Sequence, residues 1–276
     1  MMKKTLLSVV FALCAWLAVC AQQFYGVDMD KLTLIVEQSE KLPQDNAVFL
    51  MNSTMETLTK TPMAYRKALE LVERRLGNPA DSLHSEELYI AALQHSVKGY
   101  VLGASEKERQ QRLLDNALKN RIGTEAANLE FVTPDGGTHR LSDYAGKHVL
   151  LYFNDPDCDA CQKVKQRMEQ STVIKGLVDD GKLAVVAVYP DDNAKLWKRG
   201  TYPEWMVNGW DKAQQIEENE LYVMPPALPV FYLLSPERIV LMKNETSLTR
   251  MENALGKVMA SGTTDAVAVA KMLFMK

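Results

Sequence analysis

Apolar residues recur at helical spacing from about Asp28 to Gly123, and almost no alternating strand pattern appears there. Thr61 followed by Pro62 predicts the start of a helix, because threonine caps helices and proline suits the first helical position. This helix is expected over 63–76, with the stop signal Gly77-Asn78-Pro79 after it. The pattern predicts an all-helical segment.

A later helix in the same segment is predicted from Ser105 and Glu108, which have the spacing of a capping box. We expect this helix to end at Gly123. Its apolar face would consist of Leu113, Leu114, Ala117 and Leu118.

Beyond Gly123 the pattern changes to short apolar strands that alternate with helices. Two strands around Pro134-Asp135-Gly136-Gly137 predict a hairpin. A continuously apolar run such as 182–189 is typical of a parallel strand at the centre of a sheet. The predicted strands are 129–132, 138–141, 147–153, 182–189, 230–234 and 239–243, and the predicted helices are 162–170, 193–199, 248–260 and 266–274. This alternation implies an α/β domain with a mixed sheet flanked by helices.

Residues 1–21 have the pattern of a secretory signal, with basic residues first, an apolar run over 6–19 and a small residue at the cleavage point. The apolar run is too short to be a typical membrane-spanning helix. Cys20 lies in a sequence similar to a lipoprotein cleavage box, but Val19 is bulky for the position before it. Lipidation at Cys20, and with it membrane anchoring, is therefore the weaker interpretation. We expect an exported, periplasmic protein.

The chain carries 32 basic and 35 acidic residues, a formal net charge of −3, and no basic run of the kind that follows a phosphate backbone. Nucleic acid is therefore not an expected partner. Lys163, Lys165 and Arg167 alternate with other residues along one predicted helix and are interpreted as a solvated face. With 47% hydrophobic residues the chain is long enough for two cores, so we expect a helical domain over 25–124 and an α/β domain over 125–276.

Four cysteines are present, and Cys14 and Cys20 lie in the predicted signal segment. Cys158 and Cys161 remain as a single pair, which excludes a disulfide framework. A structural zinc site needs four ligands, and the sequence offers no second pair. The spacing is that of a redox dithiol, in which one cysteine attacks a disulfide and the other resolves the mixed disulfide. No metal and no cofactor are expected.

The order of the predicted elements resembles the thioredoxin fold and, more narrowly, the exported TlpA-like thioredoxins. The resemblance covers about 128–260. It rests on the strand that leads into Cys158-Asp159-Ala160-Cys161 and on Leu228-Pro229 directly before the strand over 230–234. The preceding helices, especially the segment over 120–126, are similar to an uncharacterised helical domain that accompanies such thioredoxins. The expected fold is a thioredoxin-like domain preceded by an all-helical domain.

The resemblance implies a thiol-disulfide oxidoreductase that acts on protein thiols or disulfides and is recycled by a separate redox partner. Cys158 would be the nucleophile, at the first turn of a helix where unpaired N–H groups favour an anion. Cys161, one turn later, would resolve the mixed disulfide. Pro229 matches the cis-proline that faces the cysteine pair in this fold. The backbone just before it, at Leu228, would pair with an extended substrate.

Three positions depart from the family pattern. Asp157 stands where tryptophan usually precedes the first cysteine, and Val230 stands where threonine often follows the proline. Tyr152 stands where thioredoxins carry a buried acid. No proton acceptor for Cys161 is therefore evident from the sequence.

Asp155, Asp157 and Asp159 surround the nucleophilic thiol with negative charge, which disfavours a second anion nearby. We therefore predict a reducing or weakly poised pair. Asp155 also argues against a thiol peroxidase, because those relatives carry threonine or serine at this position. A further alternative is a non-catalytic binding module with a structural disulfide. The aromatic residues between Trp197 and Trp210 are assigned no role.

Overall fold

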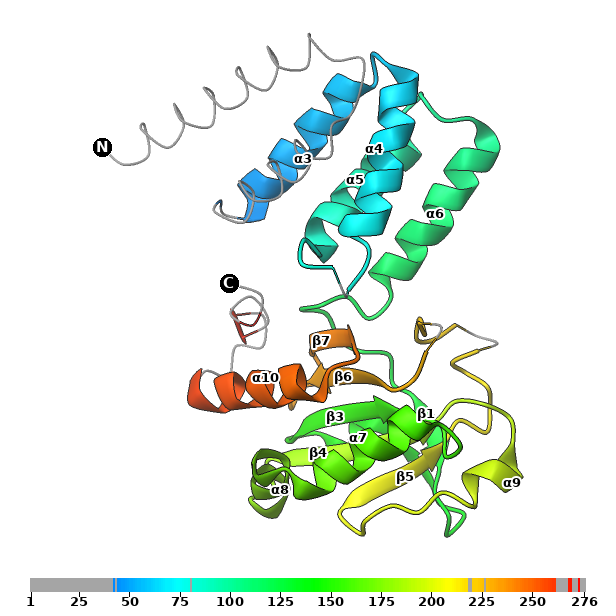
Figure 1. Ribbon diagram of the computed structural model, residues 1–276, viewed down its shortest axis with the longest axis vertical. Helices are drawn as coiled ribbons and strands as arrows, with labels where there is room; N and C mark the ends of the chain where they lie inside the picture. Colours follow the sequence, from blue (N-terminus) through cyan, green and yellow to red (C-terminus); the bar gives the residue numbers. More distant parts are fainter. Residues whose placement is uncertain are drawn as a thin grey trace. The chain divides into compact units, whose positions relative to one another are not determined.

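The computed structural model describes residues 42, 44–79, 81–217, 220–225, 227–261, 268–269 and 273 of the chain. The predicted signal segment with Cys14 and Cys20, the start of the predicted helical domain and most of the predicted helix over 266–274 lie outside these residues. The chain divides into two compact units between Leu118 and Lys119 (Figure 1). Among the described residues, no helix has the length and apolar character needed to cross a membrane.

The described part of the first unit is helical, as predicted. Its core is formed by side chains from the first three helices of the unit, which include Met51, Tyr65, Val72, Leu76 and Ala92. The last helix joins through a smaller cluster of Leu114 with two residues of the helix before it. The helices are α3 (Gln44–Leu58), α4 (Pro62–Arg75), α5 (Glu86–Lys98) and α6 (Ala104–Leu118).

The helix caps of the first unit differ from the prediction. Ser105 lies inside α6, and the helix start is instead held by Glu106, whose Oε2 accepts the backbone N–H of Gly103 at 2.9 Å. The predicted capping box of Ser105 with Glu108 is therefore wrong. Thr61 occupies the N-cap position of α4, as predicted, but its side chain makes no capping hydrogen bond.

The end of α6 also differs from the prediction. The helix ends at Leu118 instead of Gly123, and Leu118 is exposed, not part of the buried face. Gly123 belongs to the second unit, where its N–H donates to the carbonyl of Val240 at 2.8 Å. Its φ of +81° explains the glycine, since other residues rarely adopt this conformation.

The second unit holds a seven-stranded mixed sheet in the order β2-β1-β5-β4-β3-β6-β7. The neighbours β3, β4 and β5 run parallel, whereas β6 and β7 are antiparallel on one side and the β1–β2 hairpin lies on the other. The hairpin and the parallel pairing of β4 were predicted. The strands are β1 (Glu130–Val132), β2 (Thr138–Arg140), β3 (His148–Phe153), β4 (Leu183–Tyr189), β5 (Met206–Trp210), β6 (Val230–Leu234) and β7 (Val240–Glu245).

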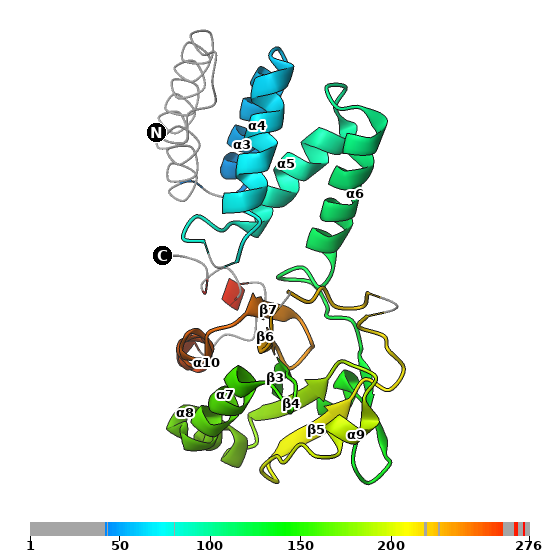
Figure 2. The ribbon, with the colours of Figure 1, turned by 45° about the vertical axis from the view of Figure 1, so that its right-hand side comes forward.

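Three helices cover one face of this sheet (Figures 1 and 2): α7 (Asp159–Gln170), α8 (Thr172–Asp179) and α10 (Leu248–Ser261). Two short helical segments lie in the connections, the 3₁₀ turn η1 (Leu141–Tyr144) after the hairpin and α9 (Ala194–Trp197) after β4. The architecture is a sheet flanked by helices, in agreement with the predicted fold class.

Three elements of the second unit were not predicted: η1, β5 and α8. Asn208 and Gly209 interrupt the apolar pattern of β5. Gly209 is needed because a Cβ there would lie 2.7 Å from Cδ2 of Phe131, which packs against it. α8 spans only eight residues and contains Gly176, and glycine has a low helix propensity.

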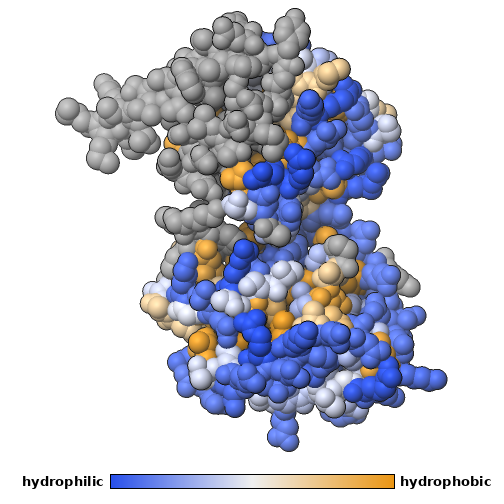
Figure 3. All heavy atoms as spheres, in the orientation of Figure 1, coloured by the Kyte–Doolittle hydropathy of each residue, from blue (hydrophilic) through white to orange (hydrophobic). Residues whose placement is uncertain are grey.

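The sheet separates two cores, because successive side chains of a strand point to opposite faces. We call the core under α7, α8 and α10 the cysteine-side core; it includes Leu150, Tyr152, Cys161, Met168, Val185, Phe231 and Met251. We call the opposite one the aromatic core; it includes Phe131, Leu151, Phe153, Val186, Tyr222, Val230 and Tyr232. On the face of the second unit that Figure 3 shows, hydrophilic residues predominate over smaller hydrophobic patches.

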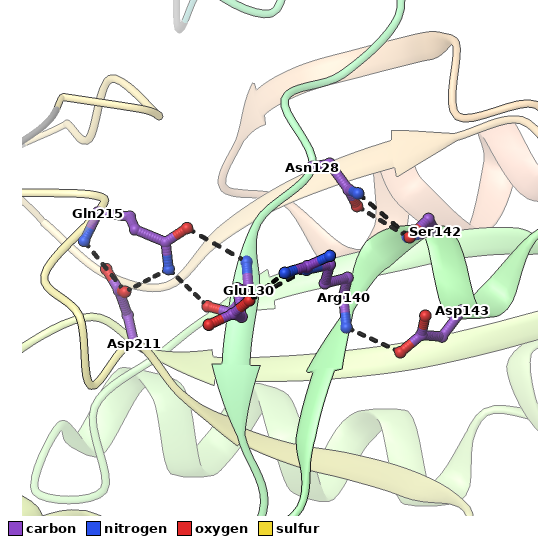
Figure 4. A network of polar contacts seen from close by, with 7 residues as sticks. All are labelled: Asn128, Glu130, Arg140, Ser142, Asp143, Asp211 and Gln215. Atoms are coloured by element: carbon purple, nitrogen blue, oxygen red, sulfur yellow. Dashed lines mark hydrogen bonds and ion pairs between the residues drawn. The ribbon is translucent and has the colours of Figure 1, made fainter.

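A polar network holds the β1–β2 hairpin in place (Figure 4). The side-chain amide of Gln215 forms two hydrogen bonds with the backbone of Glu130. Its Nε2 donates to the Glu130 carbonyl at 2.7 Å, and its Oε1 accepts the Glu130 N–H at 3.4 Å. These bonds replace those that a neighbouring strand would make. The fully buried Asp211 orients Gln215 by accepting from its Nε2 at 3.2 Å. Arg140 of β2 pairs with the Glu130 carboxylate at 2.8 Å. This network is structural.

Candidate functional site

The cysteine pair lies where β3 ends and α7 begins. β3 ends at Phe153, the chain then turns, and Cys158 occupies the N-cap position of α7. The backbone N–H of Cys161 donates to Cys158 Sγ at 3.1 Å. A cysteine here uses one of the N–H groups that a helix start leaves unpaired. The predicted placement of the pair at the start of a helix is confirmed.

The two cysteines differ in exposure. Both are free thiols, but Cys158 is partly exposed whereas Cys161 is only 1% exposed. Burial first, and then a hydrogen bond with the side chain of Cys158, raise the pKa of the Cys161 thiol to about 12. A reagent from solution therefore meets Cys158 first, and Cys161 stays protonated beneath it.

Leu228 and Pro229 lie beside the pair because of the sheet register. β6 pairs with β3 so that Val230, its first residue, lies opposite Phe153, the last residue of β3. The Leu228–Pro229 peptide bond is cis, as expected from the resemblance. The Cys158 thiol donates to the Leu228 carbonyl with an Sγ–O distance of 3.7 Å. The structure thus brings these sequence-predicted residues together.

Tyr152 occupies the position at which thioredoxins carry an acid, and its hydroxyl contacts the backbone of the pair. The hydroxyl donates to the carbonyl of Cys161 at 2.7 Å. Burial, and then the nearby Cys161 thiol, raise the pKa of Tyr152 above its usual range. Tyr152 therefore fixes the first turn of α7 without taking up a proton.

Two polar residues near the pair were missed or misassigned from the sequence. Lys165 is only 7% exposed, so its assignment to a solvated face is wrong. Its ammonium donates to the carbonyl of Thr201 and lies 5.0 Å from the ring centre of Tyr202. Tyr202 in turn donates to Oδ1 of the buried Asn154 at 2.6 Å. Only the tertiary contacts reveal this arrangement.

The three aspartates of the loop have different surroundings. Asp157 is exposed and forms an ion pair with Arg199 at 3.2 Å. Asp155 is half-buried, and its Oδ1 accepts the backbone N–H of Asp157 at 2.7 Å. Asp159 is exposed in the first turn of α7. Arg199 thus offsets part of the negative charge on which the prediction of a weakly poised pair depended.

Comparison with known proteins finds similarity to solved structures. A thioredoxin-like protein from Bacteroides caccae is 28% identical with a TM-score of 0.76, over 83% of this chain and 82% of that chain. The C-terminal domain of an uncharacterized protein from Bacteroides fragilis is 34% identical with a TM-score of 0.48, over 50% of this chain and 99% of that chain. The thioredoxin domain of a thiol-disulfide oxidoreductase from Bacteroides vulgatus is 19% identical with a TM-score of 0.42, over 50% of this chain and 96% of that chain. No family model and no curated protein matches the sequence.

Proposed function

This chain belongs to the thioredoxin-like superfamily, and we propose that it is a thiol-disulfide oxidoreductase that exchanges disulfides with protein substrates. Cys158 is the nucleophile, and Cys161 resolves the mixed disulfide. The backbone of Leu228 pairs with an extended substrate segment, and Pro229 keeps that segment next to the cysteines. The chain acts after export to the periplasm, within the TlpA-like branch of the superfamily.

One observation carries the proposal: the partly exposed Cys158 lies above the buried Cys161, at the start of α7 and against the Leu228 carbonyl. An exchange catalyst needs one sulfur that a substrate can reach and a second that attacks only after the first has reacted. The difference in exposure between the two thiols provides this order. The redox equivalents come from a separate recycling partner.

The proposal is tested by trapping. A Cys161→Ser variant, expressed in the native host, should accumulate mixed disulfides between Cys158 and exported proteins, because the resolving thiol is absent. These adducts should disappear on treatment with a reductant. A matched Cys158→Ser variant should form none of them. If the wild-type Cys158 does not react with disulfides at all, the protein is a binding module and the proposal is wrong.

The direction of exchange is a separate measurement. The reduction potential of the Cys158–Cys161 pair should lie near that of reducing thioredoxins, about −270 mV, if the negative loop charge dominates. A potential near that of the oxidant DsbA, about −120 mV, would assign the pair to oxidation of substrate thiols. The Arg199–Asp157 ion pair shifts the balance between these outcomes, since it compensates one of the three loop carboxylates.

A further inference from the structure

The connection between the parallel strands β4 and β5 contacts the loop that precedes Cys158. We call residues 199–202 of this connection the crossover segment, and residues 154–157 the cysteine loop. Three contacts join the two: the Tyr202 hydroxyl donates to Asn154 Oδ1 at 2.6 Å, Arg199 pairs with Asp157 at 3.2 Å, and Gly200 lies so close to Pro156 that a Cβ on the glycine would be 3.3 Å from Cγ of the proline. The conformation of the cysteine loop is thus tied to that of the crossover segment.

Lys165 holds the crossover segment against α7. Its ammonium donates to the Thr201 carbonyl at 2.5 Å and lies 5.0 Å from the ring centre of Tyr202. Packing alone does not explain a lysine here, because it shares the buried face of α7 with Cys161 and Met168, and a buried charge is costly unless it is paired. An apolar side chain could pack in this place but could not bond to the carbonyl. The lysine therefore serves the position of the crossover segment.

The sulfur of Cys158 has few contacts of its own. It accepts the N–H of Cys161 at 3.1 Å, and its thiol donates to the Leu228 carbonyl at a long Sγ–O distance of 3.7 Å. The backbone N–H of Cys158 donates to the carbonyl of Asp155 at 3.1 Å, so the position of Cys158 follows that of the cysteine loop. A shift of this loop would move the sulfur relative to the Leu228 backbone, where a substrate segment pairs in the proposed function.

Two other contacts limit how far the cysteine loop moves without Lys165. Gln162 of α7 donates to the Pro156 carbonyl at 2.8 Å. The buried side chain of Asn154 donates to backbone carbonyls of β3 and β4. Loss of the lysine should therefore shift the loop without unfolding it.

We propose that Lys165 is a positioning residue for the reaction of Cys158, a role that rests on the proposed function. By holding the crossover segment, it keeps the cysteine loop in the conformation that aligns Cys158 Sγ with a substrate paired at Leu228. In the reaction, Cys158 loses its proton to solvent and its sulfur bonds to one sulfur of the substrate disulfide. The bond between the two substrate sulfurs breaks, and the other sulfur leaves with the electron pair as a thiolate. A misplacement of about 1 Å in such a geometry can slow a reaction by about a hundredfold.

The test compares two probes that present the same disulfide to the reduced protein. One is a short uncharged peptide whose central cysteine is joined to thionitrobenzoate, and the other is a single capped cysteine joined to the same group. Attack by Cys158 on the cysteine sulfur releases coloured thionitrobenzoate from both, but only the peptide can pair along the Leu228 backbone. The wild type should therefore react faster with the peptide. Lys165→Met should slow the peptide reaction about tenfold and that of the capped cysteine by less than about twofold.

The controls separate position from charge and from folding. Lys163 is exposed on the same helix, so Lys163→Met removes the same charge and should leave both rate constants within about twofold. Lys165→Arg keeps a cation that can donate to the Thr201 carbonyl and should recover part of the preference for the peptide. Tyr202→Phe removes only the bond to Asn154 and should lower the same preference by a smaller factor. Urea denaturation shows which variants are folded, and Cys158→Ser gives the background from other thiols.

Several results would overturn the proposal while the proposed function stands. An unchanged preference in Lys165→Met, or equal slowing with both probes, would mean that the lysine does not align Cys158 with the substrate. If Lys165→Met does not fold, an unchanged preference in both Lys165→Arg and Tyr202→Phe has the same meaning. An equal loss in Lys163→Met would assign the effect to the charge of α7. A wild type without preference for the peptide also contradicts the alignment, and one that reacts with neither probe refutes the proposed function as well.

Discussion

One face of the sheet packs against α7, α8 and α10, and the other packs against η1 and the segments that precede β1 and follow β5. The aromatic core on the second face is built from rings in contact: Phe153 lies 5.3 Å from Tyr222 and 5.8 Å from Tyr232 between ring centres. The cysteine-side core has equally buried apolar residues but also encloses the Cys161 thiol, and the buried Lys165 of the same helix reaches the carbonyl of Thr201. The cysteine pair thus lies on one face, while the other face is packed with aromatic rings.

The contrast between the cysteine-side core and the aromatic core shows how a small unit can be stable and still hold a reactive group. Buried polar groups are costly unless each finds a partner. On the cysteine side they find backbone carbonyls: Tyr152 at Cys161 and Lys165 at Thr201. In the aromatic core the hydroxyl of the buried Tyr222 likewise donates to a backbone carbonyl, that of Ala127. Substitutions on the two faces should therefore have separable effects.

The largest expected effect tests whether the two cores are equally well packed. Leu150 and Leu151 are neighbours in β3, are both 0% exposed, and belong to the cysteine-side core and the aromatic core respectively. Leu150→Ala and Leu151→Ala should each lower the free energy of unfolding by about 2–5 kcal/mol, because each leaves a cavity. Urea denaturation followed by tryptophan fluorescence measures this, since Trp197 and Trp210 lie in the same unit. A loss well below this range at one position alone would show that its core is loosely packed.

A smaller effect separates packing from chemistry. Tyr152→Phe and Tyr222→Phe each remove one hydroxyl that donates to a backbone carbonyl, at 2.7 Å and 2.6 Å. Each should cost about 0.5–1.5 kcal/mol in the free energy of unfolding. Only Tyr152→Phe should also change the rate at which Cys161 resolves a mixed disulfide, because only that hydroxyl fixes the first turn of α7. Equal resolution rates in the two variants would contradict this division between the faces.

The smallest effect at neutral pH is expected at Lys165, but it depends on pH. Burial lowers the pKa of Lys165 below its ordinary 10.5, and Glu169 opposes the shift. At pH values between the lowered pKa of Lys165 in the folded protein and 10.5, this residue binds more protons in the unfolded chain than in the folded one. Its contribution therefore makes the free energy of unfolding rise with pH in that range. Lys165→Met should change stability by less than about 1 kcal/mol at pH 7, because loss of a hydrogen bond is offset by removal of a buried charge.

The difference between wild type and Lys165→Met isolates this contribution from the tyrosines that titrate at similar pH. Their raised pKa values act in the opposite direction, but they are present in both proteins. Denaturation midpoints measured from pH 7 to above 10.5 should show the wild type gaining stability relative to the variant. A difference that stays constant with pH would mean that the ammonium is solvated, as the sequence pattern suggested.

Much of the fold could be predicted where the chain carries strong local patterns. The apolar runs of β3, β4 and β6 were recognised because these strands are buried on both faces. β5 was missed because Gly209 interrupts its apolar pattern. A glycine is needed there to leave room for the ring of Phe131, a residue almost eighty positions earlier in the chain. Such a pairing leaves no periodic signal. The first unit shows the same limit at its helix ends, where Glu106 at Gly103 replaced the predicted capping box.

The candidate site was predictable to the extent that its residues are adjacent in sequence. The spacing of Cys158 and Cys161 and the position of Pro229 before a strand were sufficient to locate the pair and its neighbour. Lys165 was misassigned because the long apolar stem of a lysine can be either buried or exposed to solvent. Only the contact of its ammonium with the Thr201 carbonyl shows that this lysine is buried.

The side chain of Gln215 has a consequence for how these molecules behave in a crowded solution. β1 meets β5 only at Val132 and Trp210, so the backbone of Glu130 would otherwise face outward as an unpaired stretch of strand. Such stretches recruit strands from other molecules and begin aggregation. By bonding both the N–H and the carbonyl of Glu130, Gln215 closes that gap with a side chain. A single amide thus protects a weak point of the sheet against association between chains.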